Sequence, residues 1–407
     1  MVYLAKTWLR TRLRPYIRNS ERLYRVYAAI RVPTEEYGVS SSRRRYASTA
    51  ARLGISVPTG AALQHALRQR LAQRGIVPTA KPKGALHIFT TYPNAMWEAN
   101  FPRLLKPFGD VSVFDWRARG FDDTSHLWLR QRDEMNRQML EHFAAVHAER
   151  PVDVVFAYVS GHTVGPETLA AMGARGAIVV NVCMDDKGGF PGPKEGGRYK
   201  SPAAIAAAVD LNLTTSTESL VKYAVHGGLP MFFPLAADPE LCQPPTMPFA
   251  YDVTFVGGKH AFRPFFIDRL RQLGIVVETF GSGWPRGPIS DEDRIRVYAQ
   301  SRINLGFSAT GNSRNVLYLK GRDFEIPMSG GLYLTSENPE LARCFDVGRE
   351  IVTYRDEDDC AQKIRWLLSH EAEAGAIRRA GVERARREHT WEHRLADVFT
   401  VVGFLQS

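Results

Sequence analysis

The residues from Tyr251 to Arg263 combine a strand-like run, a glycine pair and two cations, a pattern suited to binding phosphate. The run YDVTFV is rich in β-branched and aromatic residues, and it is followed by Gly257, Gly258 and Lys259 and by Arg263 at the predicted start of a helix. Glycine lets the backbone approach a ligand closely, and a helix N-terminus favours an anion. A diphosphate leaving group that has no metal ion beside it would need such donors. The alternative is an ordinary strand-turn-helix whose cations lie on the surface.

Three side chains further along the chain could contact the rest of a nucleotide. Trp284, in the loop GSGWPRGP, could support a nucleobase or could pack that loop down. Arg322 precedes a short predicted helix and could add positive charge near phosphates, or it could be solvated. Glu325 is predicted at the start of that helix. Its two oxygens could accept hydrogen bonds from vicinal hydroxyls, or the side chain could cap the helix.

Three polar side chains in the first half of the chain are candidate catalytic residues. His162 lies in the turn SGHTVG, and Asp185 and Asp186 follow the run AIVVNVC. A histidine there could orient a sugar or accept a proton, and a carboxylate could contact hydroxyls or act as a base. The alternatives are an exposed turn histidine and an Asp-capped loop. Adjacent carboxylates point in two directions and have no third ligand nearby, so no metal site is predicted.

A further polar group follows the first strand-like run, LHIFTTY. Asn94, Trp97 and Asn100 lie there and are candidates for contacts with an acceptor substrate. Trp97 could stack on a sugar face or could belong to the core.

These candidates follow an alternation of strand-like and helical segments that predicts an α/β fold. The strand-like runs are continuously apolar, as strands covered on both faces should be. A proline-rich segment, 234–249, interrupts the alternation, which then restarts. We therefore expect two doubly wound, Rossmann-like domains that face a central cleft. The predicted parts are a basic helical N-terminal extension (1–80), an acceptor domain (84–235), a donor domain (250–390) and a terminal helix (391–407).

From Asp252 onward the chain resembles a known family. The ordered motifs VTFVGG, FGSGW, INLGFS, GRDFEIPMSGGLYLT, FDVGREIVTY and REHTWEHR are similar to the C-terminal half of CgeB-type glycosyltransferases, a group-1-like branch of the GT-B superfamily. The resemblance extends over about 150 residues. In the first half it rests on DVVFAYVSGH and NVCMDD, and residues 1–80 do not take part in it.

The resemblance implies a GT-B fold and the transfer of a sugar from a nucleotide-sugar donor bound mostly by the C-terminal domain. It adds Gly281 and Gly330 to the donor-binding candidates and favours the ribose-binding role for Glu325. Many retaining members carry a second glutamate earlier in the chain, where this sequence has Leu317. The resemblance therefore implies neither retention nor inversion.

Positive charge is concentrated in the N-terminal segment. Residues 1–80 contain 15 Lys and Arg against three Glu and no Asp, whereas the remainder of the chain is slightly acidic. Aromatic and leucine residues recur among the arginines at roughly helical spacing, which suits an anionic membrane surface or packing on the protein itself. The run VSSSRRRYASTA (39–50) is predicted to be a flexible joint. Nucleic acid is not an expected partner, because the rest of the chain is not basic.

Composition bounds the remaining expectations. No apolar run approaches the ~18 residues that span a bilayer, and the four cysteines lie far apart, so neither a disulfide framework nor a zinc cluster is expected. We expect a cytoplasmic protein, peripheral on the inner face of the membrane. The predicted function is a glycosyltransferase that uses no metal or other cofactor and acts on a cell-envelope polysaccharide, glycolipid or protein. The alternatives are a nucleotide-sugar 2-epimerase-like enzyme and a non-catalytic nucleotide-binding scaffold recruited to membranes.

Overall fold

The computed structural model describes residues 16–17, 20–92, 100–243 and 247–406. The chain forms two compact units. The N-terminal unit contains residues 41–234 and 391–407, and the C-terminal unit contains residues 1–40 and 235–390. Each unit has its own sheet and its own hydrophobic core.

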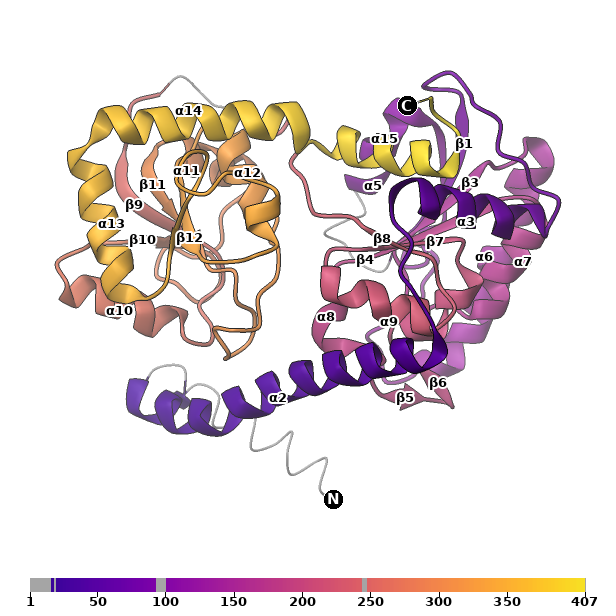
Figure 1. Cartoon of the computed structure of the whole chain (residues 1–407), viewed down its shortest axis with the longest axis horizontal. Coiled ribbons are helices and arrows are strands. Elements are labelled where there is room, and N and C mark those ends of the chain that lie inside the picture. The colour runs from indigo at the N-terminus through magenta and orange to yellow at the C-terminus, as the bar shows by residue number, and fades with distance from the viewer. Residues whose placement is uncertain (1–15, 18–19, 93–99, 244–246, 407) are drawn as a thin grey trace. The chain divides into compact units, whose positions relative to one another are not determined.

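The N-terminal unit is built on a parallel sheet (Figure 1). Its strands are β1 (Leu86–Thr91), β2 (Gly109–Val113), β3 (Val154–Ala157), β4 (Ile178–Cys183), β7 (Leu211–Thr214) and β8 (Pro230–Phe232). Its main helices are α3 (Gly60–Ala72), α5 (Asn100–Leu105), α6 (Trp128–Glu149), α7 (Pro166–Ala174), α9 (Leu220–Val225) and α15 (Trp391–Val402). The strand order is β2-β1-β3-β4-β7-β8. β1, β3 and β7 are buried along their whole length, as strands covered on both faces must be.

The C-terminal unit repeats this architecture. Its strands are β9 (Tyr251–Val256), β10 (Glu278–Phe280), β11 (Ser301–Leu305), β12 (Tyr333–Ser336) and β13 (Val352–Tyr354). Its main helices are α10 (Arg263–Gln272), α11 (Asp291–Ala299), α12 (Arg322–Met328), α13 (Glu357–Ser369) and α14 (Glu371–Glu388). The described strands pair in parallel in the order β10-β9-β11-β12-β13. Chain order runs outward in one direction from β9 to β10 and in the other from β11 to β13, so the strand order reverses between β9 and β11. Open α/β sheets bind ligands at the carboxyl ends of the strands beside such a reversal.

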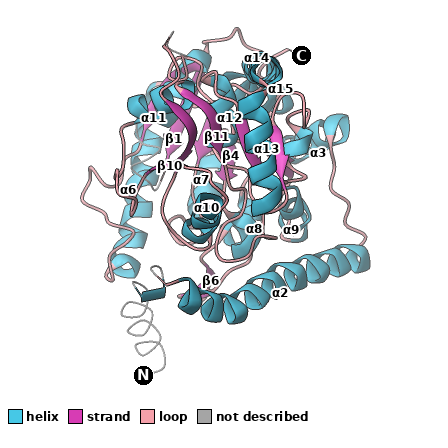
Figure 2. Ribbon diagram, turned by 90° about the vertical axis from the view of Figure 1, so that its left-hand side faces the viewer, coloured by secondary structure: helices cyan, strands magenta, loops and turns pink. Residues whose placement is uncertain are grey.

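Both sheets are enclosed by helices, so the predicted α/β fold with two Rossmann-like domains is confirmed (Figure 1 and Figure 2). In the C-terminal unit α10 contacts α13, whereas α12 contacts α11 and α14. Local sequence sets several helix starts. Ser290 and Asp356 accept hydrogen bonds from the backbone N–H groups of Asp293 and Asp359 at the beginnings of α11 and α13.

A short insertion between β4 and β7 carries polar residues at the edge of the first sheet. It contains α8 (Asp186–Gly189) and a hairpin of β5 (Lys194–Glu195) and β6 (Arg198–Tyr199). Glycines at positive φ, Gly196 and Gly197, form the hairpin turn.

The N-terminal segment differs from its prediction. The run 39–50, expected to be a flexible joint, lies inside the long helix α2 (Glu21–Leu53). Tertiary packing explains the difference: Tyr46 and Ala50 are 5% exposed, and Tyr46 packs against Phe190 in the core of the N-terminal unit. Tyr24, in the first half of α2, stacks on Phe265 of α10 with 4.8 Å between ring centroids. Intramolecular packing, one of the two alternatives for this segment, therefore holds for these aromatic residues.

Within the described residues, no helix combines the length and the apolar character needed to cross a bilayer. The four cysteines all lie in described parts of the chain, and none of them forms a disulfide.

Candidate functional site

The turn that follows β9 brings backbone and cations together at the reversal of strand order. A Cβ atom at Gly257 would lie 2.9 Å from the ring of Phe255 and 3.0 Å from Nη2 of Arg322, so this position has room only for glycine. A Cβ atom at Gly281 would lie 2.6 Å from the backbone of Gly257. The turns after β9 and β10 are therefore packed backbone to backbone, which requires glycine at both positions.

Trp284 and Lys259 hold this pair of turns in place. The indole Nε1 of Trp284 donates a hydrogen bond of 2.8 Å to the carbonyl of Gly257, and the Lys259 ammonium lies 5.5 Å from the centroid of the indole ring. The Lys259 N–H also donates to the carbonyl of Ser282 at 2.8 Å. Of the two roles considered for Trp284, these contacts are those of a tryptophan that packs the loop.

Two guanidinium groups converge on the turn. Arg263 is the first residue of α10 and only 5% exposed, and Arg322 is the first residue of α12. Their guanidinium carbons lie 5.6 Å and 5.4 Å from the ring centroid of Phe255. Although the two residues are 59 positions apart in sequence, the adjacency of β9 and β11 brings their helix starts together.

Neither guanidinium has a carboxylate partner among the described residues. Arg263 makes contacts of 3.2 Å with the carbonyl of Gly258 and 2.9 Å with the imidazole of His260. Nη1 of Arg322 is buried without a hydrogen-bond partner in the described structure. Burial, and then the neighbouring charge of Arg322, lower the pKa of Arg263 to about 9, so Arg263 still stays cationic at neutral pH. A buried cation and a half-buried one that lie close together without a carboxylate partner among the described residues are costly, and a bound anion would relieve that cost.

Glu325 lies one turn after Arg322 and pairs with a residue that the sequence did not point to. The helix starts at Arg322, with Gly321 at the N-cap position, so Glu325 is in the interior of the first turn and does not cap the helix. Its Oε2 accepts a hydrogen bond of 2.7 Å from Nη1 of Arg294 on α11. Oε1 has no such partner in the described part of the chain. Gly330 has a positive φ of 82° just after α12, which accounts for glycine there by turn geometry.

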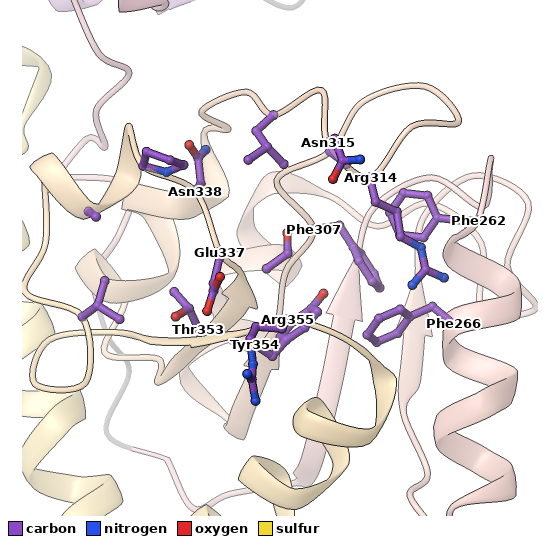
Figure 3. A pocket seen from close by; sticks show the side chains of 16 residues that line it. Phe262, Phe266, Phe307, Arg314, Asn315, Glu337, Asn338, Thr353, Tyr354 and Arg355 are labelled. Carbon is purple, nitrogen blue, oxygen red and sulfur yellow. The ribbon is translucent and has the colours of Figure 1, made fainter. Parts of the chain in front are cut away.

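A cavity of about 580 Å³ lies at the carboxyl ends of β11, β12 and β13 (Figure 3). One wall is aromatic: Phe262, Phe266 and Phe307 line it, and the Phe307 ring centroid is 5.8 Å from the guanidinium of Arg263. Polar groups line the other parts of the cavity, among them Glu337 and Thr353. The predicted donor-binding residues are not among its lining residues. Sequence reasoning missed this cavity because its walls come from several separate loops.

The loop after β11 forms part of this cavity and is held by α2. Glu35 accepts hydrogen bonds from the backbone N–H groups of Asn312 (2.9 Å) and Ser313 (3.1 Å). Glu36 accepts one of 2.8 Å from the side-chain amide of Asn315, which lines the cavity. The N-terminal helix therefore holds the loop that forms one wall of this cavity.

The three candidate catalytic residues meet at a second cavity, of about 390 Å³, within the N-terminal unit. His162, Asp185 and Asp186 all line it, at the carboxyl ends of β3 and β4. Asp185 is exposed, whereas Asp186 is 2% exposed and accepts a hydrogen bond of 2.9 Å from the Tyr223 hydroxyl. Burial raises the pKa of Asp186 above its ordinary value. Of these two adjacent carboxylates, therefore, only Asp185 is accessible.

Both ring nitrogens of His162 are engaged. Nδ1 lies 3.1 Å from a carboxylate oxygen of Glu195 on β5, and Nε2 lies 3.1 Å from the carbonyl of Asp123. Both neighbours are acceptors, and a neutral imidazole has a single N–H to donate. His162 could therefore act as a base only by giving up one of these contacts. The sequence did not single out Glu195, whose hairpin is too short to leave a periodic signal.

The acceptor-binding candidates can be followed only in part. Asn94 and Trp97 lie outside the described residues, and Asn100 is the half-buried first residue of α5. Among the residues that the structure describes, no group of three or more His, Cys, Asp or Glu side chains is arranged to hold a metal ion.

Comparisons with known proteins agree with this architecture. Residues 263–400 match the family model described as glycosyl transferase-like. No curated protein sequence matches the chain. The fold is similar to that of a glycosyltransferase from Rickettsia africae, with a TM-score of 0.54, 9% identity, and 78% of this chain and 98% of that chain covered.

The fold is also similar to that of HepE from Anabaena in complex with UDP. The TM-score is 0.53 at 10% identity, with 77% of this chain and 100% of that chain covered. HepE in complex with UDP-glucose gives a TM-score of 0.50 at 12% identity, with 77% and 98% covered. At these identities the likeness concerns the fold, which is GT-B, with two Rossmann-like domains and an added N-terminal helix.

Proposed function

We propose that the chain is a glycosyltransferase that transfers a sugar from a nucleotide-sugar donor to a cell-envelope polysaccharide, glycolipid or protein. The observation that carries the proposal is the pair of guanidinium groups, Arg263 and Arg322, that converge on the glycine turn after β9 without a carboxylate partner in the described structure. A diphosphate is the anion that such a pair would hold, because guanidinium binds phosphate oxygens with short, charge-assisted hydrogen bonds.

Two findings from the comparisons support this assignment. The matched family segment, 263–400, includes both arginines. HepE, which shares the fold, was solved with UDP and with UDP-glucose. We extend that ligand class, a nucleoside diphosphate and its sugar ester, to this chain as part of the proposal.

The proposed chemistry uses the arginine pair to stabilise the leaving group. When the bond between sugar and diphosphate breaks, negative charge develops on the diphosphate, and fixed cations in a buried site stabilise that charge most in the transition state. In this proposal the two arginines replace a metal ion. The exposed Asp185, rather than the engaged His162 or the buried Asp186, would contact the acceptor hydroxyl.

Ligand binding to arginine variants tests the donor site. Arg263→Ala should weaken binding of a nucleoside diphosphate by roughly ten- to a hundredfold, the value of one charged hydrogen bond, and should leave free nucleoside binding nearly unchanged. Arg271→Ala is the matched control, because Arg271 lies on the same helix but is exposed and paired with Asp268 at 2.7 Å. Equal losses for both ligands would contradict the proposal.

Stability without ligand gives a second measure. Arg322→Met removes a half-buried charge that has no carboxylate partner among the described residues, and it keeps an apolar side chain, so the melting temperature of the free protein should stay the same or rise. Addition of a nucleoside diphosphate should stabilise the unaltered protein more than the variant. A large loss of stability in Arg322→Met without ligand would mean that Arg322 is structural.

Turnover separates the three functions considered. A transferase consumes the nucleotide-sugar and releases nucleoside diphosphate, faster when the acceptor is present. An epimerase converts the nucleotide-sugar without any acceptor and without releasing nucleoside diphosphate, and a scaffold binds it unchanged. Release of nucleoside diphosphate across a panel of nucleotide-sugars, followed by chromatography, is therefore the deciding measurement.

A further inference from the structure

The cavity of about 580 Å³ in the C-terminal unit is not used by the proposed donor site, because Arg263, Arg322 and Glu325 do not line it. Its volume lies within the range of about 300–1,000 Å³ that is usual for small-molecule sites. Three phenylalanine rings form one wall. Figure 3 shows Glu337 and Thr353 on the side of the cavity away from these rings. The cavity therefore offers an apolar surface and hydrogen-bonding groups to the same ligand.

Each cation that lines the cavity has a carboxylate partner within the protein. Arg314 pairs with Glu357 at 2.6 Å, and the exposed Arg355 lies 3.5 Å from Asp359. Glu337 is exposed, and no hydrogen bond or ion pair engages its carboxylate among the residues that the structure describes. The charge that the lining leaves without a partner is therefore negative, so the cavity favours a neutral ligand over an anionic one.

The amide side chains of the lining are engaged within the protein, which does not favour a nucleobase as the ligand. Nδ2 of Asn338 donates to the carbonyl of Tyr318 at 3.3 Å, and Oδ1 of Asn338 accepts from the N–H of Glu340 at 3.0 Å. The side-chain amide of Asn315 donates to Glu36 on α2 at 2.8 Å. Recognition of a base edge needs donors and acceptors in a fixed pattern, whereas a free carboxylate accepts hydrogen bonds from hydroxyl groups in several orientations.

We propose that this cavity binds a neutral hexopyranose, with the apolar face of the sugar against the phenylalanine wall and with Glu337 accepting hydrogen bonds from its hydroxyl groups. A pyranose ring has a face of C–H groups and a rim of hydroxyls, which match an aromatic surface and a carboxylate. A uronic acid is disfavoured, because its carboxylate would meet that of Glu337. The sugar of a nucleotide-sugar and a unit of a glycan present the same ring. The assignment stands on the cavity and does not rest on the proposed transfer reaction.

Saturation-transfer NMR with the full chain tests the proposal without any activity measurement. The probes are the methyl glycosides of glucose, galactose and mannose, and the methyl glycosides of the three matching uronic acids. At least one neutral glycoside should bind, and its uronic acid counterpart should bind about fivefold or more weakly, because two neighbouring carboxylates repel each other. Glu337→Gln should weaken binding of the neutral glycoside by about tenfold and should abolish its preference over the uronic acid, because the site loses a charged acceptor.

Because Glu337 is exposed, the melting temperature of Glu337→Gln should match that of the unaltered protein. Glu373→Gln is the matched control, since Glu373 is also exposed in the C-terminal unit but does not line the cavity, and it should bind every probe like the unaltered protein. The proposal is overturned if none of the neutral glycosides binds, if the uronic acid binds as well as its neutral counterpart, or if Glu337→Gln keeps the preference.

Displacement of the bound methyl glycoside identifies the source of the sugar. Displacement by a nucleotide-sugar of the same hexose, but not by the nucleoside diphosphate alone, means that the sugar of the nucleotide-sugar occupies the cavity. Displacement by an oligosaccharide of that hexose, but not by the nucleotide-sugar, means that a glycan unit does. Displacement by neither overturns the proposal. Binding of nucleoside diphosphate to Arg263→Ala is a separate measurement, so failure of the sugar site and failure of the diphosphate site are distinguishable.

Discussion

Replacing Glu325 by glutamine tests the ribose-binding role with little change in shape. In the structure Oε2 accepts a hydrogen bond of 2.7 Å from Arg294, and the two side chains are 20% and 27% exposed. Arg294 also pairs with Asp291 at 3.0 Å, so it keeps one carboxylate partner after the substitution. Glutamine keeps one acceptor oxygen for Arg294 but replaces the other carboxylate oxygen with an NH₂ group.

The expected magnitudes differ for stability and for binding. A hydrogen bond to a charged group contributes about 1.5–3 kcal/mol. In Glu325→Gln the bond from the charged Arg294 is kept but its acceptor loses its charge, so the free energy of unfolding should fall by about 1 kcal/mol. If Glu325 also accepts hydrogen bonds from the two ribose hydroxyls of a bound donor, nucleotide binding should weaken by roughly tenfold or more, about 1.4 kcal/mol.

Calorimetric titration with a nucleoside diphosphate and its 2′,3′-dideoxy analogue measures the binding effect, and denaturant unfolding measures stability. The variant should lose affinity for the ribonucleotide and much less for the dideoxy analogue, which has no hydroxyls to hold. Glu278→Gln is a matched control, because Glu278 pairs with Arg286 at 2.9 Å on the surface of the same unit. It should change neither affinity.

Two outcomes would refute the ribose-binding role. One is equal affinity of Glu325→Gln and the unaltered protein for both ligands. The other is a loss of stability with equal losses of affinity for both ligands, which would mean that Glu325 serves only to hold Arg294 and the start of α12.

Two further predictions concern carboxylates that sequence reasoning did not select. Glu35→Gln should speed amide hydrogen exchange at Asn312 and Ser313 by about tenfold, because their N–H groups lose a charged acceptor. The control variant Glu21→Gln should leave this exchange unchanged. Unchanged exchange in Glu35→Gln would mean that α2 does not hold the loop. Asp323 accepts a hydrogen bond of 2.6 Å from Tyr333, and burial raises its pKa to about 6. The stability that Asp323 contributes is therefore fully present below pH ~4 and is lost as the pH rises through about 6. Between these pH values the free energy of unfolding of the unaltered protein, relative to that of Asp323→Asn, should fall by up to about 3 kcal/mol. Parallel curves of unfolding free energy against pH for the two proteins would contradict this prediction.

The sequence predicted the fold because parallel sheets leave a clear pattern. Continuous apolar runs that alternate with helical segments indicated two doubly wound sheets, and the proline-rich segment marked the interruption between them. The sequence also predicted a glycine turn after β9, and the structure gives a reason for glycine there that the sequence could not show: a Cβ atom at position 257 would meet Phe255 and Arg322. The sequence did not predict the partner of Glu325. Arg294 lies on a different helix, and whether its side chain reaches Glu325 depends on how α11 and α12 pack.

The N-terminal segment shows the limit of local composition. Serines and arginines in 39–50 suggested a flexible joint, yet the run is helical because Tyr46 and Ala50 are buried in the N-terminal unit. The count of charged residues in segment 1–80 is correct, but a count does not show which charged side chains are paired within the protein. All three glutamates of segment 1–80 lie between Glu21 and Glu36, and Glu35 also pairs with Arg31 at 3.5 Å, so the positive excess of the segment lies outside this stretch.

Two arginines of the C-terminal unit, Arg314 and Arg263, lie in similar aromatic surroundings but differ in whether a carboxylate neutralises them. Arg314 lies over the rings of Phe262 and Phe266, much as Arg263 lies over Phe255 and Phe307, but Arg314 pairs with both oxygens of Glu357 at 2.6 Å and 3.0 Å. The charge of Arg314 is therefore neutralised within the protein by Glu357, as expected for an arginine with a structural role. Arg263 is more deeply buried and, within the described residues, has no such partner, so its charge, together with that of Arg322, is left for a ligand to neutralise.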